Sequence, residues 1–161
     1  MVKGVKIIGD FHIHSRFSIA SSKKLIPEYL DYWAACKGIG IVGTGDCTHP
    51  GWLEECREKL EESDPGLFKL RPEYSLQENC GLQEETAPVR FIITGEISNI
   101  YKKDGKVRKV HNLVFLPGFE EAEKFQEELS KRGNITSDGR PILGLSSRDL
   151  FEILLSVSSR A

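Results

Sequence analysis

The stretch "VKIIGDFHIHS", residues 5–15, decides the fold, because a short apolar run leads directly into three polar side chains that can bind metal. Residues 5–13 contain β-branched residues and predict a buried strand. In an extended strand, side chains two positions apart point to the same side. Asp10, His12 and His14 would then share one face at the end of that strand.

The composition indicates one globular domain. The chain has 161 residues, and its 39% hydrophobic and 29% charged residues are typical of a protein that buries its own core. The formal net charge of -2 gives no globally basic surface that would by itself indicate nucleic-acid binding. No apolar run reaches the ~20 residues of a membrane span and no long apolar signal segment opens the chain, which favours a cytoplasmic protein without a membrane partner.

The cysteines show no pattern of a metal site or a disulfide framework. None of them forms a C-x-x-C pair. Because the chain has no sign of secretion, reduced thiols are expected rather than disulfides. The four are Cys36, Cys47, Cys56 and Cys80.

Strand and helix signals alternate along the rest of the chain. Residues 66–88 have no clear period and are expected to form a loop or insertion with one possible short strand. The other expected elements, in chain order, are a helix over 27–37 between Pro27 and Gly38, a glycine-rich strand over 39–45, a helix over 50–63, a strand over 89–97, a hairpin over 101–117 with its turn at Asp104-Gly105, a helix over 119–132 with Ala122, Phe125 and Leu129 inward, a short strand over 141–147, and a last helix from about Ser147.

This order predicts an α/β fold with a mostly parallel sheet and covering helices. The number of β/α units is low for a closed barrel, and the apolar stripe of the last helix needs a surface to pack on. We therefore expect residues 1–161 to be the front part of a longer domain. A small open sheet, complete as given, is the alternative.

Four places in the sequence put metal-capable side chains near strand ends, where α/β folds bind ligands. Each is weak alone, because a lone histidine is often a core residue and a lone carboxylate is often a helix cap. All four histidines of the chain nevertheless fall in these places, and imidazole with carboxylate suits zinc, manganese or iron in an open site. The candidates are Asp10, His12 and His14 in the first place, Asp46 and His49 in the second, Glu96 in the third and His111 in the fourth.

One dense basic cluster lies in the predicted hairpin "YKKDGKVRK", residues 101–109, beside Tyr101. Such a cluster can contact the phosphates of a nucleic acid. The alternative is a solvated hairpin whose lysines protect a sheet edge. The candidate DNA-binding residues are Lys102, Lys103, Lys106, Arg108 and Lys109.

The ordered motifs "DFHIH", "GTGDCTH", "TGEI" and "VHNLVF" resemble those of the polymerase-and-histidinol-phosphatase (PHP) family of metal-dependent phosphoesterases. Within that family the chain is most similar to the N-terminal PHP domain of the endonuclease Q group of DNA-repair nucleases. The resemblance runs from residue 5 to about residue 157. It implies that the chain forms the front part of a distorted (β/α)7 barrel.

The resemblance also implies a set of catalytic metal ligands, which hold two or three divalent ions (zinc, manganese or iron). That set is His12, His14, Asp46, His49, Glu96 and His111, with Asp10 orienting the first histidine pair from behind. In "GDCTH" Asp46 and His49 are three apart where the family usually has adjacent residues, so either of them can be the ligand. A later histidine and a D-x-H motif of the family would lie beyond Ala161.

The implied activity is metal-dependent hydrolysis of phosphodiesters by a DNA-repair endonuclease, which cuts 5′ of deaminated bases or abasic sites in DNA. Two alternatives stay open. One is a small-molecule phosphatase of the same family, acting on histidinol phosphate or a nucleotide. The other is a truncated, inactive chain or a binding module that keeps vestigial histidines.

Overall fold

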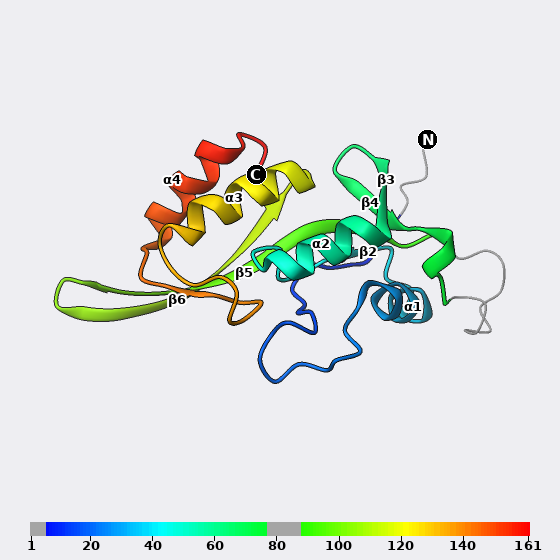
Figure 1. Cartoon of the computed structure of the whole chain (residues 1–161), viewed down its shortest axis with the longest axis horizontal. Helices are drawn as coiled ribbons and strands as arrows, with labels where there is room; N and C mark the ends of the chain where they lie inside the picture. Colours follow the sequence, from blue (N-terminus) through cyan, green and yellow to red (C-terminus); the bar gives the residue numbers. More distant parts are fainter. Residues whose placement is uncertain (1–5, 77–87) are drawn as a thin grey trace.

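The computed structural model describes residues 6–76 and 88–161, which form a mixed sheet with helices packed on it (Figure 1). Residues 77–87 of the predicted loop, including Cys80, lie outside the described residues, as does the start of the first predicted strand. None of the helices in the described ranges has the length and apolar character that a membrane crossing requires.

A single long strand, β5 (Arg90–Lys103), organises the sheet. The strands pair in the order β1-β2-β5-β4-β3, and β6 and β7 pair with β5 along its later residues. The other strands are β1 (Gly9–Asp10), β2 (Ile41–Gly43), β3 (Leu60–Asp64), β4 (Leu67–Leu70), β6 (Lys106–Leu116) and β7 (Ile142–Leu143).

The prediction of a mostly parallel sheet was wrong. The pairs β1–β2, β2–β5 and β5–β7 are parallel, whereas β3–β4, β4–β5 and β5–β6 are antiparallel. Two of the three antiparallel pairs are hairpins, since tight turns join strands only in an antiparallel sense. One is β5–β6, and the other is β3–β4, which occupies the sequence where a helix end and a loop were expected.

The helix predicted over 50–63 ends early. Helix α2 (Pro50–Lys59) stops at Lys59, and Leu60 begins β3, where it pairs with Leu70 and is buried. Glu61, Glu62 and Ser63 have ordinary helix propensity, but pairing with β4 overrides it. The first strand is also shorter than predicted, because only Gly9–Asp10 pair with β2 and Ile8 stays exposed at this edge.

The remaining helices follow the predicted pattern. They are α1 (Pro27–Lys37), α3 (Phe119–Ser130) and α4 (Ser147–Val157), with a short 3-10 helix η1 (Pro72–Tyr74). Gly38 ends α1 in the left-handed conformation, as its position after the last helical residue predicts. The inward residues predicted for α3, namely Ala122, Phe125 and Leu129, are fully buried.

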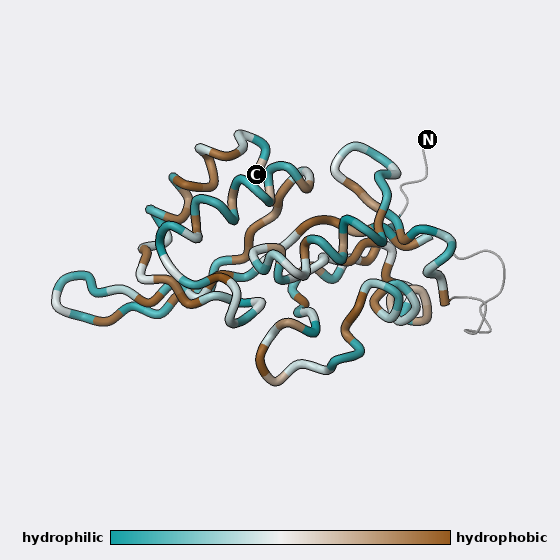
Figure 2. The backbone as a smooth tube through the Cα atoms, viewed as in Figure 1, coloured by the Kyte–Doolittle hydropathy of each residue, from teal (hydrophilic) through white to brown (hydrophobic). Residues whose placement is uncertain are grey.

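Strand β5 separates the core from the candidate site. Its odd-numbered residues Phe91, Ile93 and Ile97 are fully buried in the hydrophobic core, where Figure 2 shows a hydrophobic run through the middle of the molecule. Because strand side chains alternate, the even-numbered residues, among them Glu96 and Ser98, point to the opposite face of the sheet.

The expectation of reduced cysteines is only partly met. Cys47 and Cys56 are free and buried, but Cys36 takes part in a disulfide. Cys47 packs against Gly95 of β5, where a side chain larger than hydrogen would meet its sulfur at 2.7 Å. Cys47 therefore fills the core behind the sheet and does not face the candidate site.

Candidate metal centre

Three histidines converge on the carboxylate of Glu96. The Nε2 atoms of His12 and His14 lie 3.0 and 3.3 Å from Glu96 Oε2, and His111 Nδ1 lies 2.6 Å from Glu96 Oε1. Glu96 is 2% exposed while the histidines are partly open to solvent, so the carboxylate forms the floor of the site. Among the described residues, His12, His14 and Glu96 place ligand atoms within 4.8 Å of one another, close enough to share one metal ion.

The chain brings these four residues together from two segments. His12 and His14 follow β1 in a segment that has left the sheet, and Glu96 and His111 come from the paired strands β5 and β6. In that register Glu96 lies opposite Leu113, and His111 lies opposite Ser98. Glu96 and His111 therefore point to the same face as diagonal neighbours, two residues apart along the strands.

Asp46 holds His14 in place from the side away from Glu96. It follows β2 in a tight turn, where Gly45 and Asp46 are both left-handed, and its side chain is fully buried. Its Oδ1 accepts from His14 Nδ1 at 3.0 Å. Its Oδ2 accepts from Ser15 N, Ser15 Oγ and Ser18 Oγ at 2.6, 2.7 and 2.8 Å.

This contact fixes which nitrogen of His14 faces the site. Since a carboxylate can only accept, Nδ1 of His14 carries the proton, and in a neutral ring Nε2 then has a bare lone pair. That nitrogen lies 3.3 Å from Glu96 Oε2, which is also an acceptor. Two acceptor atoms this close repel each other unless a proton or a metal ion lies between them, and imidazole with carboxylate is a suitable ligand pair for a divalent metal ion.

The environment of Glu96 also suits a cation. Burial would raise the pKa of Glu96, but the hydrogen bond from His12 and the charges of His12, His111 and Arg140 outweigh it and lower the pKa below its usual range. Its Oε1 is buried without a hydrogen bond of good geometry, despite the short approach of His111. An ionised carboxylate with a free acceptor oxygen is a strong ligand for a hard or borderline metal.

His49 lies elsewhere. It precedes the first turn of α2, its Nε2 donates to the carbonyl of Thr136 at 3.1 Å, and its ring stacks on Phe17 with centroids 4.3 Å apart. The structure thus brings His12, His14, Glu96 and His111 together, with Asp46 behind them, and holds His49 against the loop before β7. That His49 binds a metal stays a prediction.

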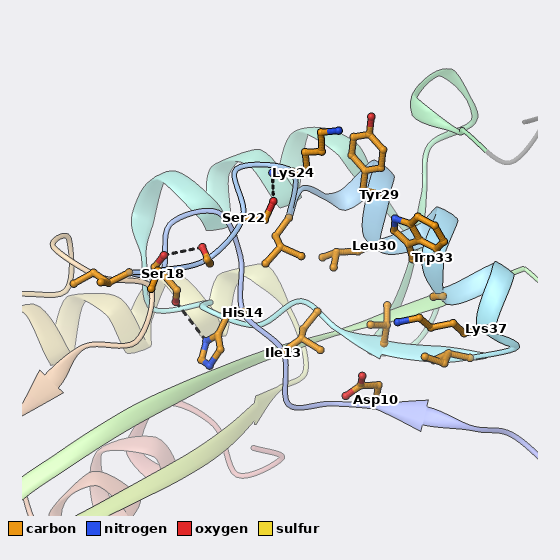
Figure 3. A pocket seen from close by; sticks show the side chains of 17 residues that line it. Asp10, Ile13, His14, Ser18, Ser22, Lys24, Tyr29, Leu30, Trp33 and Lys37 are labelled. Carbon is orange, nitrogen blue, oxygen red and sulfur yellow. Dashed lines mark hydrogen bonds between the residues drawn. The ribbon is translucent and has the colours of Figure 1, made fainter. Parts of the chain in front are cut away.

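Asp10 lines a cavity next to His14. The cavity measures about 670 Å³ and lies between the segment after β1 and helix α1, with Leu30 and Trp33 on its apolar wall (Figure 3). Among the hydrogen bonds of the described residues, none joins Asp10 to His12 or His14. Its predicted orienting role therefore stays a prediction.

Sequence reasoning missed Arg140, Ser15 and Ser18. The two serines hold Asp46, and Arg140 Nη1 lies 3.9 Å from Glu96 Oε2. Ser15 directly follows the H-x-H pair, which is a usable signal. Arg140 is 44 residues beyond Glu96 in a loop without periodic pattern, and nothing in the sequence connects it to the site.

The basic hairpin forms as predicted, with Asp104 and Gly105 in left-handed conformations at its turn. It projects from the body of the molecule and ends in a mostly hydrophilic tip (Figures 1 and 2). By strand alternation, Lys102 lies on the face that carries Glu96, and Lys109 lies on the face that carries His111. Two of the five basic residues of the hairpin therefore lie on the same face as the candidate metal centre.

In comparisons with known proteins, the chain is similar in structure and sequence to endonuclease Q. No family model matches the chain. The lesion-specific endonuclease PfuEndoQ from Pyrococcus furiosus has a similar structure, with a TM-score of 0.72 and 30% sequence identity over 94% of this chain. Endonuclease Q in complex with a 27-mer duplex, which carries an abasic lesion at the active site, gives a TM-score of 0.71 and 31% identity over 92% of this chain.

The chain is similar to one part of endonuclease Q. It spans 32% of the length of both solved endonuclease Q chains. The chain is also 32% identical over 149 residues to the uncharacterized protein MJ0043 of Methanocaldococcus jannaschii. The aligned region covers 92% of this chain and 15% of that protein.

Proposed function

We propose that this chain carries a metal centre for phosphodiester hydrolysis in DNA, as part of an endonuclease Q-like repair nuclease with a PHP-type fold. The observation that carries the proposal is the convergence of three imidazoles on the buried carboxylate of Glu96. The similarity to endonuclease Q, above 25% identity over nearly the whole chain, supports the choice of substrate.

In this proposal His12, His14, Glu96 and His111 hold the ions, and Asp46 positions His14 by accepting from its Nδ1. Bound divalent cations supply an activated water near neutral pH and stabilise charge on the phosphoryl oxygens. Glu96 reaches His12 and His14 with one oxygen and His111 with the other, so both of its oxygens would be available to hold metal ions.

The proposed substrate is DNA that contains a deaminated base or an abasic site, cut on the 5′ side. The lysines and arginine of the β5–β6 hairpin would contact backbone phosphates. Extruding a damaged nucleotide from the duplex costs a few kcal/mol, and least for a base that is already mispaired. The cavity of about 670 Å³ beside His14 has the size of a small-ligand pocket and offers room for such a nucleotide.

The direct test is cleavage of an end-labelled duplex with one uracil or abasic site in the presence of Mn²⁺ or Zn²⁺. We expect one product, cut on the 5′ side of the lesion, and no cut in undamaged duplex. The variant His12→Ala/His14→Ala should lose both bound metal and cleavage, whereas the surface variant Lys124→Gln on α3 should keep both.

Two results would contradict the proposal. Release of phosphate from a small monoester without cleavage of the damaged duplex would favour a phosphatase. A chain that binds no divalent metal at this site, measured by elemental analysis and by Mn²⁺ titration, would remove the proposed chemistry altogether.

A further inference from the structure

Arg140 is a cation placed directly beside the candidate metal centre. Its Nη1 lies 3.9 Å from Glu96 Oε2, the same oxygen that faces His12 and His14. The side chain is 39% exposed, so its guanidinium keeps donors free on the open side of the site. Arg140 lies in the loop two residues before Ile142, which pairs with Ser98, so the loop brings it to the part of β5 that carries Glu96.

A guanidinium in this position is unfavourable for metal binding alone. Like charges a few ångströms apart repel, and the repulsion is stronger in a partly buried site than in water. The charge becomes favourable when an anion is bound between the arginine and the metal ions. Arginine is the side chain best suited to bind the oxygens of a phosphate group with two parallel hydrogen bonds.

The loop that carries Arg140 is fixed on both sides of it. Gly139 N donates to Phe17 O at 3.0 Å, and Gly139 O accepts from Thr48 Oγ1 at 3.1 Å. On the other side, the carbonyl of Pro141 accepts from Ser98 N at 3.0 Å. The backbone on both sides of Arg140 is thus tied to the two segments that hold the metal-site residues.

Three further hydrogen bonds hold this loop. Asp138 Oδ1 accepts from Ile19 N and Arg140 N at 3.2 and 3.1 Å, and the carbonyl of Thr136 accepts from His49 Nε2. A loop with this many partners loses little entropy when a ligand binds, which is the condition for a pre-organised binding group.

We propose that Arg140 binds a non-bridging oxygen of the phosphate group next to the metal ions and so positions it at the site. This inference rests on the proposed function, because it needs metal ions at Glu96 and a phosphate-containing substrate. It assigns to Arg140 the binding of an anion, whereas His12, His14, Glu96 and His111 hold the cations. It also gives His49 a role, since His49 anchors the loop that presents Arg140.

The test measures metal and phosphate binding separately, without any catalytic turnover. Mn²⁺ affinity is followed by the electron paramagnetic resonance signal of free Mn²⁺. Inorganic phosphate is the probe for the anion, and its binding to the Mn²⁺-loaded chain is followed by the relaxation of its ³¹P signal. The variants are Arg140→Ala and Arg140→Lys. The matched control is Arg90→Ala, because Arg90 lies at the start of β5, away from Glu96, and its side chain pairs with Asp64 of β3.

We expect Arg140→Ala to weaken phosphate binding by roughly tenfold to a hundredfold, as loss of charged hydrogen bonds does. Arg140→Lys should fall between Ala and the parent chain, because lysine keeps the charge but not the paired donors. Mn²⁺ affinity should be unchanged or higher in both variants, and Arg90→Ala should match the parent chain in both measurements.

Two outcomes would overturn the role of Arg140 alone: phosphate affinity that does not change in Arg140→Ala, or Mn²⁺ binding that is lost with it, which would make Arg140 a structural partner of Glu96. A parent chain that binds Mn²⁺ but not phosphate would also refute it. A parent chain that binds no Mn²⁺ would instead refute the proposed function, and the role of Arg140 with it.

Discussion

The carboxylate of Asp46 accepts from four donors, one of which is the imidazole of His14. The donors from Ser15 and Ser18 all bind Oδ2, and His14 alone binds Oδ1. The two oxygens are therefore not equivalent. An amide at this position would keep its oxygen toward the serines and turn its NH₂ group toward His14.

The first prediction concerns this contact. In Asp46→Asn, the amide donates to His14 Nδ1, which forces the proton onto Nε2, the nitrogen that faces Glu96. We expect metal affinity to fall about 10–100-fold, as for other lost partners of metal-binding histidines. Mn²⁺ titration measures the affinity, and the ¹⁵N shifts of the imidazole report its tautomer. Unchanged affinity with an inverted tautomer would show that His14 is not a ligand.

The second residue-scale prediction concerns the free cysteines. Burial raises the pKa of both Cys47 and Cys56, and neighbouring carboxylates raise it further. Since the thiolate is the reactive form, a raised pKa leaves almost none of it at pH 8. We expect both thiols to react with a thiol reagent at least ~100-fold more slowly in the folded chain than in urea. Fast reaction of either thiol in the folded chain would contradict their placement in the core.

At the scale of elements, the loop of residues 134–141 contacts the candidate metal centre through Gly139. A Cβ at this position would overlap the carboxylate of Asp46 and come within 2.7 Å of Ser18 Oγ. Only glycine lets the loop lie against Asp46. The loop therefore contacts Asp46, and Asp46 in turn contacts His14.

The third prediction follows from this contact. Gly139→Ala should destabilise the chain by about 1–3 kcal/mol, because the added methyl group has no space. It should also weaken Mn²⁺ binding, since Asp46 must move. Gly144→Ala is the matched control, because a Cβ there meets nothing within 4 Å. Urea unfolding and Mn²⁺ titration measure both effects, and equal behaviour of the two variants would contradict the proposed contact.

The sequence predicted elements better than it predicted their pairing. The apolar periods of α3 and the left-handed position of Gly38 are local signals, and both were confirmed. The β3–β4 hairpin was missed because Leu60 becomes a strand residue only through its partner Leu70, and a local period does not report such a partner.

The same division applies to the site. His12, His14, Glu96 and His111 were predicted from motifs, and the structure brings them to one place. The separate positions of Asp46 and His49 depend on the left-handed turn after β2. This turn places Asp46 behind His14, whereas His49 lies against Thr136. Arg140 was not predicted at all, because only tertiary contacts bring its loop to the site.

At the scale of the whole molecule, the β5–β6 hairpin gives an otherwise acidic chain a localised positive surface. The formal net charge is -2, and yet five exposed basic residues gather near the tip of this one projection. Long-range attraction of a polyanion would then act on the hairpin first. Contacts of these side chains with backbone phosphates would carry no sequence preference.

The fourth prediction tests this surface. Lys102→Gln/Lys109→Gln should weaken binding to duplex DNA and reduce the slope of log K against log salt by about 2, since each phosphate contact contributes about 0.9. The pair Lys124→Gln/Lys131→Gln, with Lys124 on α3 and Lys131 directly after its end, removes the same charge from a different part of the molecule and should leave the slope unchanged. Fluorescence anisotropy across a salt series measures both, and equal losses would assign the effect to net charge.

Strand β5 is shared by every part of the sheet, since it pairs with β2 and β4 early along its length and with β6 and β7 later. Because both halves share this strand, loss of one half leaves β5 with fewer partners and weakens the other half. We therefore expect one calorimetric transition, with a van't Hoff enthalpy about equal to the measured heat. Two resolved heat-absorption peaks would mean that the molecule divides along β5 into independently folding parts.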